Sequence, residues 1–402
     1  MQTRVNIKNG DVLSILGFGC MRLPVKNGSI DEPRSIQMIH DAIENGVNYF
    51  DTAYVYQNGK SELLVGKALA GGYRERVKIA TKLPPFMVSK LSGAQKILAT
   101  QLERLQTGYI DYYLLHMLTD KAMFDRLVGL GVLVWLEEMK SKGTIRNLGF
   151  SFHGSKADFE AIIQAYPWDF CQIQYNYMDE HNQATKSGLL LAASLGIPVI
   201  VMEPLRGGKL VTHLPEQVKK AFSDSNPSRS PAEWALRWVW NHPEVTVVLS
   251  GMSDEAQAAE NIRIAGEVTP GSLTDQELTV FEQVKAELLA RTKIPCTACG
   301  YCMPCPFGVD IPGCFSCYND KYLMGDKSVR FRYMQTMGVM SAKPANASQC
   351  TQCGKCESHC PQKIAIRDQL KTVSHEMEGI FYKPLVGIAR KILRVKKPLR
   401  FK

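Results

Sequence analysis

The chain has 402 residues, 45% of them hydrophobic, and a formal net charge of +9. The length favours two domains, and the composition is ordinary for a globular protein with a large core. The charge is concentrated at the end, because eight basic and no acidic residues follow Glu378, and without these eight the chain has 40 basic and 39 acidic residues. A near-neutral body argues against a nucleic acid as partner.

The first residues contain no apolar run like that of a signal peptide, and no stretch reaches the roughly 20 apolar residues of a membrane-spanning helix. We therefore expect a cytoplasmic protein without a transmembrane segment.

Short apolar runs alternate with amphipathic stretches as far as about residue 265, after a hairpin at residues 4–16. The pattern predicts strands at 17–21, 46–51, 77–82, 111–116, 145–151, 170–175, 197–204 and 245–251. It predicts helices at 32–45, 61–70, 90–105, 132–142, 156–165, 184–195, 232–241 and 255–265, and leaves 119–131 as an apolar loop. Eight such units predict an α/β fold, a (β/α)8 TIM barrel. The rival is a doubly wound open sheet, which usually carries a Gly-rich fingerprint after a strand, and none is found here.

Polar residues recur at the carboxyl ends of the predicted strands: Asp51, Lys82, His116, Ser151, Gln172 and Glu203. Each alone has an ordinary structural explanation, but six in succession favour a site at the face where barrel enzymes hold theirs. Tyr56 follows Asp51 by five residues. If Lys82 lies beside Tyr56, its ammonium lowers the pKa of the phenol, and Asp51 keeps that ammonium charged. With His116 to orient a carbonyl oxygen, this is a site for protonating a carbonyl while hydride arrives from a cofactor.

These residues fall in motifs that resemble the aldo/keto reductase family between about residues 3 and 265. The motifs are FDTA at 50–53 followed by Tyr56, ATK at 80–82, DYYLLH at 111–116, LGFS at 148–151, QIQYN at 172–176 and QAAEN at 257–261. The resemblance implies a catalytic tetrad of Asp51, Tyr56, Lys82 and His116, a small-molecule carbonyl substrate, and NAD(P)H as the hydride donor.

The resemblance also implies nicotinamide contacts from Ser151 and Gln172, and adenosine-side contacts near Gly251, Gln257 and Asn261. Met202 stands where many relatives stack an aromatic residue on the nicotinamide, and Phe152 where an asparagine often holds the carboxamide. Arg206 and Lys209 flank Gly207-Gly208 and are candidates to bind the pyrophosphate. FMN remains an alternative cofactor, because barrels commonly hold phosphates at this face.

Ten of the twelve cysteines lie between Cys296 and Cys360. They form a Cys-x2-Cys-x2-Cys-x2-Cys-Pro run at 296–306 and a Cys-x2-Cys-x2-Cys-x3-Cys-Pro run at 350–361. The second run has the bacterial ferredoxin spacing, in which the fourth cysteine ligates the other cluster. We expect one [4Fe–4S] cluster on Cys296, Cys299, Cys302 and Cys360, and another on Cys350, Cys353, Cys356 and Cys305. The first run is one residue shorter, which leaves a single cluster as an alternative, and zinc is the other alternative.

The cysteine module resembles a dicluster ferredoxin domain, and the whole chain resembles the iron–sulfur branch of the aldo/keto reductases. We therefore predict a barrel over residues 1–270, a linking helix over 271–292, a small and mainly helical ferredoxin-like iron–sulfur domain over 293–378, and a basic amphipathic tail over 379–402. Cys314 and Cys317 are expected to be packed or free thiols rather than ligands. The tail is interpreted either as a frayed end or as a short helix that contacts a membrane surface weakly or docks on a redox protein.

Two functional hypotheses follow. The first is an NAD(P)-dependent iron–sulfur oxidoreductase that reduces a carbonyl with Tyr56 as proton donor and exchanges electrons with its clusters. The alternative is a redox-sensing or electron-carrier subunit whose barrel binds nicotinamide or FMN without carbonyl turnover. Nicotinamide moves two electrons as hydride and each cluster moves one, so direct coupling requires a radical or a flavin that the sequence does not reveal.

Overall fold

A computed structural model describes residues 1–212, 214–225, 227–296, 302–323, 328–339, 341, 343–360 and 363–392. The chain divides into two units. The first comprises residues 1–210 and 229–278, and the second comprises residues 211–228 and 279–402. The predicted Cys299 and the last ten residues of the predicted tail lie outside the described residues.

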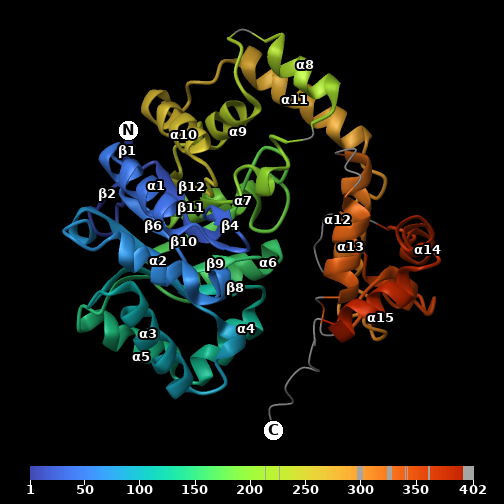
Figure 1. Ribbon diagram of the computed structural model, residues 1–402, viewed down its shortest axis with the longest axis horizontal. Coiled ribbons are helices and arrows are strands. Elements are labelled where there is room, and N and C mark those ends of the chain that lie inside the picture. Colours follow the sequence, from blue (N-terminus) through green and yellow to red (C-terminus); the bar gives the residue numbers. More distant parts are fainter. Residues whose placement is uncertain are drawn as a thin grey trace. The chain divides into compact units, whose positions relative to one another are not determined.

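Eight parallel strands close into a barrel in the first unit (Figure 1). Each strand pairs with the next one along the chain, and the last pairs back with the first. Their near-continuous apolar sequences suit this position, because both faces of each strand are covered. The strands are β3 (Leu16–Gly19), β6 (Tyr49–Asp51), β7 (Lys78–Leu83), β8 (Ile110–Leu118), β9 (Ile145–Phe152), β10 (Phe170–Gln174), β11 (Val199–Met202) and β12 (Val245–Ser250).

Helices alternate with these strands along the chain, as the sequence pattern predicts for a (β/α)8 barrel. The predicted TIM barrel is confirmed. The helices are α1 (Glu32–Glu44), α2 (Lys60–Ala68), α3 (Leu91–Leu105), α4 (Lys121–Gly129), α5 (Val132–Ser141), α6 (Lys156–Ile163), α7 (Thr185–Ser194), α9 (Pro231–Trp240) and α10 (Glu255–Glu267).

The helix α4 corrects the prediction that residues 119–131 form a loop. The Asp120 carboxylate caps this helix by accepting a hydrogen bond from the Met123 amide at 2.7 Å, and Phe124 and Leu127, three residues apart, are both buried. An aspartate before an apolar pair at helical spacing is a start signal that the sequence already contained.

A hairpin of β1 (Thr3–Val5) and β2 (Val12–Ser14) closes the amino-terminal end of the barrel. Leu13 joins the inner core, where the Tyr112 ring lies edge-on between Tyr49 and Phe170 at 5.2 and 5.0 Å. Asp11, in the turn, accepts a 2.8 Å hydrogen bond from the Tyr112 hydroxyl. Because side chains fill this end of the barrel, we expect the active site at the opposite, carboxyl-terminal end of the strands.

The second unit is mainly helical. It contains α8 (Glu216–Ser223), α12 (Ile311–Leu323), α13 (Val329–Tyr333), which continues into a π-helix (Met334–Val339), α14 (Ile366–Met377) and α15 (Tyr382–Ile392). The helix α11 (Asp275–Ala290) begins in the first unit and continues into the second. One core holds this unit together, with Phe315, Tyr333 and Val373 fully buried, and Cys314 and Cys317 of α12 lie in it. Their burial agrees with the expectation that they are packed thiols.

No described helix of either unit is both long enough and apolar enough to cross a membrane.

Candidate active site and cysteine cavity

Lys82 is the centre of the polar site at the carboxyl ends of the barrel strands. Its side chain is fully buried on β7, beside β6, which ends at Asp51. The Lys82 ammonium donates to Asp51 Oδ1 at 2.5 Å, to the Thr52 carbonyl at 2.7 Å and to the Tyr56 hydroxyl at 3.4 Å. Since an ammonium has three N–H donors, this buried charge is satisfied by these three acceptors.

Tyr56 enters the site from a short 3-10 turn (Tyr56–Gly59) after β6. The next two residues, Gln57 and Asn58, adopt positive φ angles of 47° and 59°. Left-handed backbone at non-glycine residues costs free energy and persists where the surroundings enforce it. The turn brings the Tyr56 hydroxyl to Lys82 and sets its ring edge-on to the His116 ring, with centroids 5.9 Å apart.

His116 is presented by an irregularity in β8. The pairing of β8 with β9 shifts register between Leu115 and Leu118, and Met117 has a positive φ of 54°. The Ser151 hydroxyl accepts a 2.8 Å hydrogen bond from the Met117 amide and so stabilises this bulge. A β-bulge of this kind re-aims a side chain, here that of His116.

Burial dominates the protonation states in this site. Burial raises the pKa of Tyr56 above its ordinary value, although Lys82 lowers it. The expectation of a net lowered pKa is therefore wrong for this structure, because desolvation of the phenolate outweighs a lysine that is 3.4 Å away and already paired with Asp51. Burial, with Lys82 next, lowers the pKa of His116 to about 2. At neutral pH the site thus holds a neutral phenol and a neutral imidazole.

The Lys82 ammonium remains charged. Burial alone lowers the pKa of Lys82, but the carboxylate of Asp51 and the hydroxyl of Tyr56 outweigh it, so the net pKa is raised. A fixed positive charge beside a protonated phenol stabilises the phenolate that forms when the phenol gives up its proton. The arrangement can therefore act as a general acid toward an oxygen placed between Tyr56 and His116.

Three further predicted residues lie along neighbouring strand ends. Ser151 ends β9, Gln172 lies on β10 and Met202 ends β11. The Gln172 side-chain amide donates to the Met202 sulfur at 3.5 Å. Gln172 Oε1 is buried and finds no hydrogen-bond partner within the described part of the chain. A buried acceptor without a partner is expected to be satisfied by a ligand or water, and an amide N–H would suit it.

Three other predicted cofactor residues form hydrogen bonds or ion pairs within the protein. Gln257 donates to its cap residue Asp254 at 2.7 Å, and Asn261 donates to the Ser250 hydroxyl at 3.0 Å. Arg206 pairs with Asp179 at 3.4 Å. These contacts fix the first turns of α10 and the loop after β11.

Arg22 is a cation that the sequence reasoning missed. It ends a 3-10 turn after β3, donates to the Gly207 carbonyl at 3.1 Å, and passes Gly251 so closely that a Cβ there would lie 3.4 Å from its side chain. Arg22, Arg206 and Lys209 all interact electrostatically with Glu203, at the end of β11. No local motif marks Arg22, because 185 residues separate it from Gly207; only its place after the first barrel strand was a signal.

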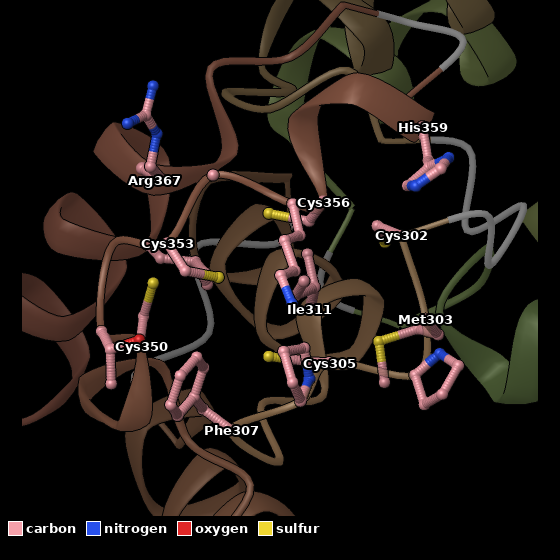
Figure 2. A pocket seen from close by; sticks show the side chains of 16 residues that line it. Cys302, Met303, Cys305, Phe307, Ile311, Cys350, Cys353, Cys356, His359 and Arg367 are labelled. Carbon is pink, nitrogen blue, oxygen red and sulfur yellow. The ribbon is translucent and has the colours of Figure 1, made fainter.

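The cysteines of the second unit surround a cavity of about 420 Å³. Five of them line it, from two separate stretches of chain: Cys302, Cys305, Cys350, Cys353 and Cys356. Figure 2 shows Cys305, Cys350, Cys353 and Cys356 with their sulfur atoms directed toward a shared space, and Cys302 beside Met303. These first four are the residues that the sequence assigns to one cluster. Cys296 and Cys360 are half-buried against the same core.

The donor set fits an iron–sulfur cluster. Thiolates are the usual ligands of such a cluster. The thiols here line a cavity and do not converge on a single point, where one metal ion would lie. Among the described residues, no three Cys, His, Asp or Glu side chains are grouped closely enough to hold a single metal ion.

Comparisons with known proteins agree with both halves of this description. The family model "Aldo/keto reductase family" matches residues 15–284, and the model "4Fe-4S dicluster domain" matches residues 295–365. Over 288 residues the chain is 28% identical to "Probable aldo-keto reductase 1" of Glycine max, covering 63% of this chain and 81% of that protein. Over 328 residues it is 27% identical to the "NADH-specific methylglyoxal reductase" of Escherichia coli, covering 69% and 96%.

A solved structure gives the same result. The holo form of an aldo-keto reductase from Bacillus halodurans superposes with a TM-score of 0.59 at 28% identity, covering 71% of this chain and 96% of that one. The chain belongs to the aldo/keto reductase family of oxidoreductases and carries a 4Fe–4S dicluster domain after its barrel.

Proposed function

We propose that the barrel reduces the carbonyl group of a small molecule, with a nicotinamide dinucleotide as hydride donor and Tyr56 as proton donor. The observation that carries this proposal is the buried Lys82 ammonium, which bonds Asp51 and Tyr56 at 2.5 and 3.4 Å. The E. coli relative, whose name describes it as NADH-specific and a methylglyoxal reductase, supports the same class of cofactor and substrate.

The residues divide the work as follows. When bound, the nicotinamide supplies a hydride to the carbonyl carbon. Tyr56 gives its proton to the carbonyl oxygen, and the ammonium of Lys82 stabilises the phenolate left behind. Asp51 keeps Lys82 charged and oriented, while the neutral His116 hydrogen-bonds the same oxygen and orients it. Gln172, whose buried Oε1 has no partner among the described residues, would hold the carboxamide of the nicotinamide, with Ser151 and Met202 on the two neighbouring strands.

The phosphate end of the cofactor is assigned to two cations, Arg22 in the loop after β3 and Arg206 in the loop after β11. Arg22 and Arg206 would hold the pyrophosphate, and Gly251 lies beside Arg22 without a side chain of its own. Gln257 and Asn261, on the first turns of α10, would hold the adenosine side of the cofactor. Arginine suits this role because its planar fork of N–H donors matches phosphate oxygens.

The second unit is proposed to hold two [4Fe–4S] clusters. Cys305, Cys350, Cys353 and Cys356 ligate the one whose cavity is seen in Figure 2. Cys296, Cys299, Cys302 and Cys360 ligate the other. Cys353 is exposed and Lys355 lies beside the same cavity. An exposed cluster edge of this kind allows one-electron exchange with a redox protein.

Replacing Tyr56 by phenylalanine tests the catalytic proposal. The loss of a general acid typically lowers the rate by about 10²–10⁴-fold, so the Tyr56→Phe variant should lose nearly all reduction of aldehydes by NADH or NADPH. The assay is cofactor oxidation with a panel of aldehydes and ketones, on protein purified without oxygen. Tyr54→Phe is the matched control, because it makes the same change two residues away, where the ring contacts Arg104.

The expected result is a large loss in Tyr56→Phe and little change in Tyr54→Phe, with equal iron content in both. Full turnover in Tyr56→Phe would exclude this residue as the proton donor. A wild-type chain that binds NADH yet reduces no carbonyl of the panel would contradict the proposed activity and favour the electron-carrier alternative.

A further inference from the structure

The helix α15 (Tyr382–Ile392) exposes an apolar stripe on its surface. Leu385 and Ile388 on the helix are 51% and 55% exposed, and Ile380 and Phe381, just before it, are 93% and 72% exposed. Positions 381, 385 and 388 follow the i, i+4, i+7 spacing of one helix face. Single exposed apolar residues are ordinary, but several on one short helix indicate a contact surface.

This stripe is distinct from the face that holds α15 to its own unit. Tyr382 and Val386 are buried, at 7% and 5% exposure, and belong to the core of the second unit. Arg390 donates to the carbonyls of Gly338, Val339 and Ser341, at the end of the π-helix. One side of the helix is therefore packed against its own unit, and the apolar stripe lies on a different, exposed side.

The charge around the stripe has one sign. Lys383 and Lys391 are exposed on the same helix, and eight basic residues but no acidic ones follow Glu378 in the sequence. The nearest preceding carboxylates point inward. Glu378 accepts hydrogen bonds from Tyr333 and Asn346, and Glu376 is bound by Lys321 and two tyrosines. No carboxylate on α15 offsets the basic residues.

We propose that α15 binds the surface of an anionic lipid bilayer, with Phe381, Leu385 and Ile388 inserted at the headgroup boundary and Lys383 and Lys391 on the lipid phosphates. An exposed apolar stripe on a helix whose exposed charged residues are lysines is the pattern of helices that lie in the membrane interface. A second copy of the chain suits this surface less well, because two such faces would bring like charges together.

Vesicle flotation with the full iron-loaded chain tests the proposal. The probes are vesicles of phosphatidylcholine alone and vesicles that also contain phosphatidylglycerol. We expect binding to the anionic vesicles, much weaker binding to the neutral ones, and loss of binding as salt shortens the range of the attraction. Leu385→Asp should weaken binding by about tenfold or more, because a charge then replaces an inserted apolar group. Val134→Asp is the matched control, since Val134 is 77% exposed on α5 of the other unit.

A second variant, Lys383→Glu with Lys391→Glu, changes only exposed charges and should reduce binding to the level of neutral vesicles. Iron content and circular dichroism identify any variant that fails to fold. Equal binding by wild type and Leu385→Asp, or absence of binding by wild type, would overturn the proposal. So would light scattering that shows a dimer which Leu385→Asp dissociates, or wild-type protein that binds an acidic redox protein but not anionic vesicles.

Discussion

In the barrel, the charged groups of the site come from neighbouring strands and satisfy one another, whereas in the second unit the thiols come from loops and surround an open cavity. Lys82 is held by Asp51 and Thr52 on the adjoining strand and its continuation. Cys302 and Cys305 lie before α12, and Cys350 and Cys353 lie before α14, with none of these four inside a regular element.

The two sites differ in what holds their side chains in place. The register of β6 against β7 fixes Asp51 and Lys82 through backbone hydrogen bonds, so the strands themselves position these two groups. The cysteines have no such register. Ligand thiols in small metal-binding units are usually ordered by the metal itself, which couples binding to folding. We therefore expect the barrel to be insensitive to loss of iron and the second unit to depend on it.

The largest expected effect is on iron content, which should differ between variants of ligand cysteines and variants of packed cysteines. Cys356→Ala removes a proposed ligand, so iron should fall from about eight to about four per chain, as loss of one of two four-iron clusters requires. Cys314→Ala changes a cysteine that is fully buried in the core of the same unit and should leave the iron content unchanged. Iron and sulfide assays on protein purified without oxygen provide the measurement.

The tryptophans make the comparison with the barrel direct, because all five lie in the first unit: Trp135, Trp168, Trp234, Trp238 and Trp240. Their fluorescence should be the same in wild type and Cys356→Ala if the barrel folds independently of the clusters. A shifted spectrum would contradict that independence. Four irons in the wild type would leave one cluster, and iron loss in Cys314→Ala would make Cys314 a ligand.

The barrel was predictable because the hydrophobic pattern of its strands and helices repeats along the sequence. Strands buried on both faces and amphipathic helices repeat eight times, and strand ends collect Asp51, Lys82, His116 and Ser151 on one face. The helix α4 is not predicted although Asp120 marks its start, because its apolar residues show no strand or helix repeat long enough to stand out. For the cysteines, spacing alone predicts that Cys305 joins Cys350, Cys353 and Cys356. These four line one cavity, but so does Cys302, which the same spacing assigns to the other cluster, so the division of ligands stays a prediction.

Two features of the active site were beyond the sequence. The role of Arg22 depends on the loops after β3, β11 and β12 meeting in space, and no pattern within any one loop shows that. The pKa of Tyr56 depends on a balance between burial and the charge of Lys82, which only distances and exposure decide. The role of Arg22 and the pKa of Tyr56 both depend on contacts that form only when the barrel closes, and not on any one strand.

A moderate effect is expected from Arg22→Ala. If Arg22 binds the cofactor pyrophosphate, the KM for NADH or NADPH should rise about tenfold while kcat changes little, because the loss is of binding that is equal in the ground and transition states. Arg76→Ala is the control, since Arg76 is an exposed arginine paired with Glu44. An unchanged KM would place the pyrophosphate elsewhere, and a fall in kcat alone would give Arg22 a role in the chemical step.

The smallest effect is in the pH dependence of carbonyl reduction. Reduction needs the protonated form of Tyr56, and burial raises the pKa of this phenol above its ordinary value of 10.0, so kcat/KM should stay level up to about pH 10 and fall only above it. No acid limb should appear near 6.5, because the pKa of His116 is lowered to about 2 and its imidazole stays neutral. The measurement is kcat/KM against pH at saturating NADH.

A basic limb below pH 9 would mean that the effect of Lys82 on the pKa of Tyr56 outweighs that of burial once cofactor is bound, as the sequence alone suggested. An acid limb near pH 6.5 would mean that water reaches His116 in the working enzyme. In the first case the barrel site, like the cysteine cavity, would be completed by its cofactor and not by its strands alone.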